Sequence, residues 1–316
     1  MYWGPSIKDY GPAGFLRQAF NRLPNVECAR YECHGDPALM GKADLHVCVD
    51  WAEDTTDYKD FLPPTPRVYW VSDTHVSPAS RAYRMAKAQQ CDRVFYNIMT
   101  DRADFEKLMS PPDQTYHYWM YNTSSWMPYA VEPQLWRPCP KVEQTYEAVF
   151  LGHYANYQER ADFLTVLSDE LGAGLWIGGD VYLEEAVLKL ASGKIIVNHA
   201  QSTSTNMRTF EGMSMGGVVL QPWTPDLDAL GFVDGVHLLV YRDVDEAIEK
   251  IRQYSDQPDE RRRIGEQARQ AILDRHTYVH RAAQMALLMD MQVTPEQIKT
   301  ALDTPAAAKW WSDYET

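Results

Sequence analysis

Short apolar runs alternate with longer stretches of helical spacing along most of the chain, and this alternation restricts the fold more than any other feature. In the first half, the runs at 45–50, 67–72 and 93–96 (LHVCVD, RVYWVS and RVFY) are almost uninterrupted, and 78–90 has helical spacing. Strands that are apolar on both faces are typical of parallel sheets connected by helices. The sequence therefore predicts an α/β protein built on parallel sheets.

The same alternation restarts after a segment rich in proline and charge at 138–144 (PCPKVEQ). A length of 316 residues suits two domains. We expect two Rossmann-like domains facing across a cleft, the first at 1–140 with the tail 285–316 packing back on it, and the second at 141–284. The elements predicted for the second domain are strands at 146–152, 175–177, 194–199, 218–220 and 237–241, with helices at 159–171, 183–191, 207–215, 245–255 and 260–275.

Charge and cysteine content narrow the class of protein. The chain has 30 Lys and Arg against 44 Asp and Glu, a net charge of −14, whereas broad binding to nucleic acid or anionic lipid rewards a basic face. Its five cysteines are odd in number and contain no C-x-x-C pair, which favours reduced thiols and a cytoplasmic location. The first residues do not predict a signal peptide, and no apolar run is long enough to span a membrane.

The clearest chemical signal is the stretch 202–220 (STSTNMRTFEGMSMGGVVL). Its polar residues Ser204, Thr205 and Asn206 lead directly into a predicted helix. The free N–H groups and the positive end of the dipole at a helix N-terminus form an anion site, and phosphate is its commonest occupant.

Two charged residues of this predicted helix could bind further parts of a phosphate-containing ligand. Arg208, in the first turn, can hold phosphate oxygens with two nitrogens. Glu211, one turn later, can accept hydrogen bonds from vicinal hydroxyls such as those of a ribose. The alternative is a capped helix with an Arg–Glu pair at i, i+3 and no ligand.

The run R-T-F-E-G-M-S-M-G-G-V-V-L, preceded by I-I-V-N, resembles the C-terminal domain of GT-B glycosyltransferases of the group 1-like kind, and most of all the spore-maturation (CgeB-like) group. Four more segments resemble the family in the same order along the chain. They are 127–138 (MPYAVEPQLWRP), 146–160 (YEAVFLGHYANYQER), 229–241 and 261–281.

The resemblance implies a nucleotide-sugar donor held by the C-terminal domain and an acceptor held by the N-terminal one. On this basis Glu211 contacts the donor ribose, while Arg208 and the amides of 204–206 hold the diphosphate. The other donor-site residues that it implies are Gly152 and His153 on the floor of the cleft, Arg160 as a second phosphate ligand, and Asn198.

Two features set limits on what the resemblance implies. Many retaining relatives carry a Glu at the position of Thr203, so no stereochemical outcome is inherited. The D-x-D strings at 226–228 and 243–245 are interpreted as a solvated turn or a helix cap rather than as metal ligands. We therefore expect no metal ion, and no cofactor besides the nucleotide sugar.

His276 and His280, four residues apart, are assigned packing and capping roles rather than a role as metal ligands.

A general base is needed if an acceptor hydroxyl attacks the donor directly. Asp73 and His75 follow the predicted strand at 67–72, and a histidine beside a carboxylate is a suitable base near neutral pH. The alternative is that Asp73 caps a turn while His75 packs on the helix that begins at Pro78. Asp50 is a second candidate for the base.

The sequence thus predicts a metal-independent glycosyltransferase that uses a nucleotide-diphosphate sugar. Its acceptor is a glycan, a protein, a small molecule or, against the net charge, a modified DNA base. Three alternatives stay open at this stage: a sugar-nucleotide epimerase or hydrolase on the same fold, a transferase acting on DNA, and a non-catalytic binding domain. Product analysis without acceptor separates the first from a transferase.

Overall fold

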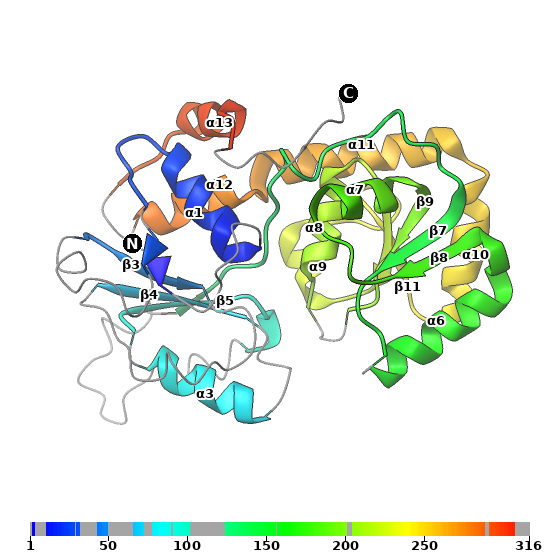
Figure 1. Cartoon of the computed structure of the whole chain (residues 1–316), viewed down its shortest axis with the longest axis horizontal. Coiled ribbons are helices and arrows are strands. Elements are labelled where there is room, and N and C mark those ends of the chain that lie inside the picture. The colour runs from blue at the N-terminus through cyan, green and yellow to red at the C-terminus, as the bar shows by residue number, and fades with distance from the viewer. Residues whose placement is uncertain are drawn as a thin grey trace. The chain divides into compact units, whose positions relative to one another are not determined.

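The chain forms two compact α/β units, each with a fully parallel sheet, as the alternating pattern predicts (Figure 1). The first unit contains Met1–Tyr129 and Tyr278–Ala307, and the second contains Ala130–Thr277. The computed structural model describes residues 2–3, 11–28, 30–31, 43–49, 66–72, 78–89, 91–101, 124–155, 157–200, 204–287 and 291–306.

The sheet of the first unit has the strand order β2-β1-β3-β4-β5-β6. The three apolar runs of the first half form its centre and are almost entirely buried. The other three strands have only two or three residues each, and so short a strand shows no periodicity from which it could be predicted. The six strands are β1 (Tyr2–Trp3), β2 (Arg30–Tyr31), β3 (His46–Val49), β4 (Arg67–Val71), β5 (Arg93–Tyr96) and β6 (Ser124–Trp126).

The helices of the first unit come from both ends of the chain. Helix α1 contacts α12 and α13, which follow it by more than 250 residues (Figure 1). Helix α13 begins with a capping box formed by Thr294 and Gln297. The described helices are α1 (Pro12–Arg22), α3 (Pro78–Ala88), the 3-10 turn η2 (Met99–Asp101), α12 (Tyr278–Ala286) and α13 (Pro295–Asp303).

Helix α12 is fixed within the first unit by two buried side chains. Arg281 donates from Nε to the Pro128 carbonyl and from Nη2 to the Tyr129 carbonyl, both at 3.0 Å. Tyr278 packs against the rings of Phe15 and Trp70. The unit border therefore lies before α12, whereas the expected border at 284 falls near the end of that helix.

The other border precedes the proline-rich segment instead of lying within it. The Val131 amide donates to the His276 carbonyl at 3.1 Å, and Val131 forms an isolated bridge with Thr277. The first and last segments of the second unit, far apart in sequence, are thus paired with each other through their backbones. The segment at 138–144, interpreted from the sequence as a linker, belongs to the second unit.

The sheet of the second unit has the order β11-β10-β9-β7-β8. Its strands correspond to the runs predicted from the sequence. A helix follows each strand, and all of these helices were predicted except α9, which lies where the sequence was interpreted as a turn. The strands are β7 (Tyr146–Leu151), β8 (Leu175–Gly178), β9 (Gly193–Val197), β10 (Val218–Pro222) and β11 (Leu239–Tyr241). The helices are α6 (Gln158–Leu171), the 3-10 turn η4 (Gly172–Gly174), α7 (Leu183–Ala191), α8 (Met207–Ser214), α9 (Pro225–Leu230), α10 (Val244–Ser255) and α11 (Pro258–Arg275).

Helices α6 and α10 cover one face of this sheet, and α8 and α11 cover the other (Figure 1). Helix α8 approaches the sheet closely because Gly212 has no side chain: a Cβ there would lie 2.6 Å from Cγ2 of Val219. The helix ends before Gly216, whose φ of 72° is a conformation that favours glycine. Within the described residues, no helix is both long enough and apolar enough to cross a membrane.

Candidate functional site

The strand order of the second unit indicates which edge of the sheet is suited to bind a ligand. The chain leaves β7 toward β8 on one side and leaves β9 toward β10 on the other, so the order reverses between β7 and β9. In open parallel sheets, ligands bind outside the carboxyl ends of the strands at such a switch point. Gly152 and His153 follow β7, and Asn198 and His199 follow β9, so three of the predicted residues gather at this edge.

Arg160 joins the two strand ends at the switch point. From α6 its Nη1 donates to the His153 carbonyl at 2.5 Å, and its Nε donates to the His199 carbonyl at 2.8 Å. Its guanidinium also lies 5.3 Å from the ring centroid of Tyr157. Burial lowers the pKa of Arg160. The structure therefore gives this side chain a role in holding the backbone, and its contact with phosphate stays a prediction.

The start of α8 is held by a pair of side-chain amides, of which Asn198 is buried and Asn206 is partly buried. The Asn198 side chain donates to Oδ1 of Asn206 at 2.9 Å, and Asn206 donates back at 3.0 Å. Asn198 also donates to Thr209 and to Gln221, at the end of β10. Asn206 is the N-cap residue of α8, yet its side chain makes no capping bond. The backbone N–H groups of the first turn are therefore not occupied by that cap.

Arg208 and Glu211 lie close together on α8. Nη1 of Arg208 is 2.8 Å from Oε2 of Glu211, and the two side chains are 18% and 7% exposed. The guanidinium lies 5.5 Å from the ring centroid of Trp136. Burial raises the pKa of Glu211, and the charge of Arg208 opposes that rise. Nε of Arg208 has no hydrogen-bond partner among the described residues, so the ion pair through Nη1 does not use all the donors of this guanidinium.

The loop before α8 is fixed by a buried carboxylate. The Thr205 amide donates to Oδ2 of Asp226 at 2.9 Å, and Asp226 is fully buried. Burial raises the pKa of Asp226 to about 6, against the lowering effect of its hydrogen bonds from Thr205. The sequence interpretation of a solvated turn is wrong for Asp226, because its side chain faces the loop rather than water. Ser204, next to Thr205, is also buried.

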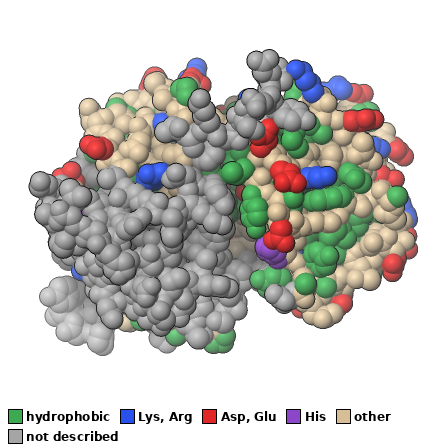
Figure 2. All heavy atoms as spheres, viewed as in Figure 1, with side chains coloured by type: hydrophobic (Ala, Val, Ile, Leu, Met, Phe, Trp, Pro, Cys, Tyr) green, Lys and Arg blue, Asp and Glu red, His purple; other side chains and the backbone are tan. Residues whose placement is uncertain are grey.

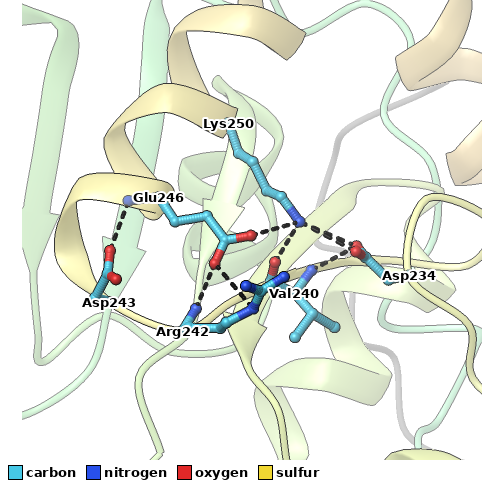
Figure 3. A network of polar contacts seen from close by, with 6 residues as sticks. All are labelled: Asp234, Val240, Arg242, Asp243, Glu246 and Lys250. Carbon is cyan, nitrogen blue, oxygen red and sulfur yellow. Dashed lines mark hydrogen bonds and ion pairs between the residues drawn. The ribbon is translucent and has the colours of Figure 1, made fainter.

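The second D-x-D string is a helix cap, as predicted. Oδ1 of Asp243 accepts from the Glu246 amide at 2.8 Å at the start of α10. Lys250, one turn further, bridges Glu246 and Asp234 (Figure 3). These contacts link β11 to α10 and account for the acidic residues there. No group of three or more potential metal ligands occurs among the residues that the structure describes.

Most of the second unit matches a known protein family. Residues 146–286 match the model of a family described as "Glycosyl transferase-like". This part of the chain is glycosyl transferase-like. No curated protein matches the sequence. The matched range begins with β7 and contains every donor-site residue that the resemblance implied. The spore-maturation group stays a prediction within this family.

Solved glycosyltransferases share the fold of most of this chain. HepE of Anabaena, solved with UDP and glucose, aligns with a TM-score of 0.62 at 12% identity over 92% of this chain and 98% of its own. Sucrose-phosphate synthase of Thermosynechococcus elongatus aligns at 0.56 and 12% identity, over 80% of this chain and 75% of its own. An α-glucosyltransferase solved with UDP-glucose and DNA aligns at 0.52 and 10% identity, over 81% and 82%. The fold is GT-B.

Several sequence-predicted residues are not placed by the structure. Asp73 and His75, the predicted base, lie outside the described residues, as do Asp50 and Thr203. His276 is buried between the rings of Phe210 and Phe232, in agreement with a packing role.

Three residues of the second unit have roles that sequence reasoning did not assign. Trp136 lies under Arg208, and its carbonyl accepts from the Ser214 hydroxyl at 2.7 Å. Asp226 holds the Thr205 amide, and Tyr241 contacts His199. Trp136 and Tyr241 both lie in segments that resemble the family. The resemblance therefore pointed to these segments, but it gave neither residue a role.

Proposed function

We propose that the chain transfers a sugar from a nucleotide-diphosphate sugar to an acceptor hydroxyl without a bound metal ion. The observation that supports this most is the start of α8, where Arg208, Glu211 and an N-terminus that Asn206 does not cap meet at the carboxyl edge of the sheet. A diphosphate and a ribose together need an anion site and a hydrogen-bond acceptor, and α8 offers both.

In this proposal the diphosphate binds at the N-terminus of α8. Glycosyl transfer has an oxocarbenium-like transition state, and negative charge develops on the departing diphosphate. Donors fixed in advance stabilise that charge, because they need no reorganisation as it forms. The helix dipole and Arg208 supply this stabilisation. The amide pair of Asn198 and Asn206 and the bond from Thr205 to Asp226 keep the loop in place.

Glu211 binds the ribose hydroxyls in this proposal. Its carboxylate has several acceptor positions, and the ion pair with Arg208 leaves some of them available. The ion pair also offsets part of the cost of burying this carboxylate. Arg208 then joins the two halves of the nucleotide site, since one guanidinium lies beside both the helix start and Glu211.

UDP-glucose is the donor to test first, because HepE is described with UDP-glucose and shares the fold. The purified protein is incubated with UDP-glucose, with and without a panel of hydroxyl acceptors, and released UDP and sugar products are measured. Transfer to an acceptor supports the proposal. Conversion of free donor to an isomeric sugar nucleotide, with no transfer, would establish an epimerase instead. Repeating the assay with GDP- and dTDP-sugars and with a metal chelator tests the donor base and the metal independence.

Asp73 and His75 stay the proposed general base on sequence grounds. Asp73→Asn and His75→Ala should each lower turnover far more than they lower donor affinity, because a base acts on the acceptor. Wild-type turnover in both variants would remove the assignment, and Asp50 would be tested next.

A DNA acceptor is disfavoured by charge. The net charge is −14, and acidic side chains are spread over the visible face of the second unit (Figure 2). Binding to DNA phosphates rewards a basic face and weakens steeply with salt. A gel shift with duplex DNA at low and high salt tests this alternative directly.

A cytoplasmic location is also proposed. Four cysteines described by the structure, Cys28, Cys48, Cys91 and Cys139, are free thiols, and the first three are buried. Burial raises the pKa of the Cys91 thiol to about 12, which makes it unreactive. Free buried thiols are typical of a reducing compartment.

A further inference from the structure

His199 has the position of a ligand-binding residue, although nothing in the proposed function uses its side chain. It follows β9 at the switch point, and its ring stacks on Phe163 with 4.6 Å between ring centroids. Its Nδ1 lies 2.7 Å from the hydroxyl oxygen of Tyr241. The imidazole is therefore held in one orientation by a ring on its face and a hydrogen bond at one nitrogen.

The hydrogen-bond network assigns the tautomer of His199. The Tyr241 hydroxyl donates to the Asn198 carbonyl at 3.3 Å, and a carbonyl can only accept. A phenol has one hydrogen to donate. With that hydrogen directed to Asn198, we assign the bond between Tyr241 and His199 to donation by Nδ1–H of the imidazole, the tautomer in which Nε2 has no hydrogen and carries a free lone pair.

The surroundings keep this imidazole neutral. Burial lowers the pKa of His199, the charge of Arg160 lowers it further, and Glu159 opposes them. Burial also raises the pKa of the Tyr241 phenol, so this partner remains protonated. Among the described residues, no side chain or backbone group hydrogen-bonds to Nε2. The edge of the site thus carries one fixed hydrogen-bond acceptor without a partner.

We propose that Nε2 of His199 accepts a hydrogen bond from an O–H or N–H group of the bound nucleotide sugar, and that Tyr241 is the residue that positions it. The inference rests on the proposed function, because it requires the nucleotide sugar to bind at this edge. A diphosphate carries no hydrogen to donate near neutral pH. The group bound by His199 therefore belongs to the nucleoside or to the sugar, both of which carry donors.

The tautomer is tested on the free protein. Nitrogen chemical shifts of 15N-labelled histidines, assigned with His199→Ala, should show the Nδ1–H form of His199 in the wild type. Tyr241→Phe removes the acceptor for Nδ1–H and should shift His199 toward the Nε2–H form, whereas Tyr254→Phe on α10 should leave it unchanged. An Nε2–H form in the wild type would overturn the proposal.

Calorimetric titration with UDP and with UDP-glucose tests the contact. His199→Ala should weaken binding about tenfold, and Tyr241→Phe should have an effect in the same direction. His237→Ala is the matched control, because His237 precedes β11 and so lies at the opposite edge of the sheet. Equal weakening of UDP and UDP-glucose places the bound group in the nucleoside, and weakening of UDP-glucose alone places it in the sugar.

The pH dependence separates a hydrogen-bond acceptor from a cation. Protonation of Nε2 removes the lone pair, so wild-type affinity relative to His199→Ala should fall as the pH is lowered through the pKa of His199. A relative affinity that rises on acidification would show that His199 acts as a cation beside the phosphates, and the proposal would be wrong. Unchanged affinity of a folded His199→Ala for both ligands would also overturn it. A wild type that binds neither ligand would instead contradict the proposed function.

Discussion

At the scale of single residues, the proposed donor site is built on polar side chains that are buried or partly buried and that pair with one another. The sequence predicted Arg208 and Glu211 from their types and spacing, and the family resemblance implied Asn198. It could not predict the partner of Asn206: an Asn before a helix is expected to cap that helix, and only the tertiary fold brings Asn198 within 2.9 Å. Asp226 was misinterpreted for the same reason, since its burial depends on the Thr205 loop.

Asp226 should make stability depend on pH. Its pKa rises from 3.8 to about 6 in the folded protein, so the folded state holds this proton more tightly than the unfolded state. Stability from this group is present at low pH and is lost as the pH rises from about 4 to about 6. Asp226→Asn keeps an acceptor for the Thr205 amide and removes the buried charge. The variant should therefore gain up to about 3 kcal/mol over the wild type at pH 7.

Denaturant unfolding of both proteins from pH 4 to pH 7 measures this difference. The free energies of unfolding of the two proteins should be equal at pH 4 and should differ increasingly as the pH rises. Asp228→Asn serves as a control from the same D-x-D string, and it should show no comparable separation. If the free energies of unfolding of wild type and Asp226→Asn differ by the same amount from pH 4 to pH 7, the pKa of Asp226 is not raised.

At the scale of elements, the position of α8 depends on glycines that let it approach the sheet and α11. A Cβ at Gly212 would lie 2.6 Å from Val219 and 3.2 Å from Ile196. A Cβ at Gly265 of α11 would lie 2.0 Å from the Gly216 carbonyl oxygen. These contacts were not predictable from the helical pattern, although the pattern located both helices.

Gly212→Ala should lower the free energy of unfolding by about 1–3 kcal/mol, because the added methyl overpacks the interface with β9 and β10 although alanine favours the helix. The comparison is Gly174→Ala, whose added methyl meets only the flexible side chain of Glu147. That control should change stability by no more than about 0.5 kcal/mol. If both substitutions change the free energy of unfolding by the same amount, α8 can move away from the sheet without loss of stability, and the prediction is wrong.

At the scale of the whole molecule, periodicity predicted two α/β units but misplaced their borders. The borders depend on contacts between segments distant in sequence: Val131 with His276, and Arg281 with Pro128 and Tyr129. Such contacts leave no local pattern. The proline-rich segment at 138–144 looked like a linker because composition alone does not distinguish a linker from a loop within a unit.

The borders make a testable prediction about fragments. A fragment of 130–277 should unfold cooperatively, because it retains buried Leu135 and Trp136. A fragment of 141–284 lacks both and carries Tyr278 and Arg281 without their partners. Its melting temperature should be lower by at least about 10 °C. Equal melting temperatures in a calorimetric scan would place the border where the sequence predicted it.

The proposed function depends above all on Arg208, which at the start of α8 would hold the diphosphate of a nucleotide sugar. Calorimetric titration of UDP-glucose into wild type, Arg208→Ala and Arg262→Ala tests it most directly, since Arg262 forms an exposed i, i+3 pair with Asp259 on α11. We expect at least about tenfold weaker binding by Arg208→Ala, unchanged binding by Arg262→Ala, and similar melting temperatures for all three proteins. Equal affinity of Arg208→Ala and wild type would show that Arg208 does not hold the diphosphate.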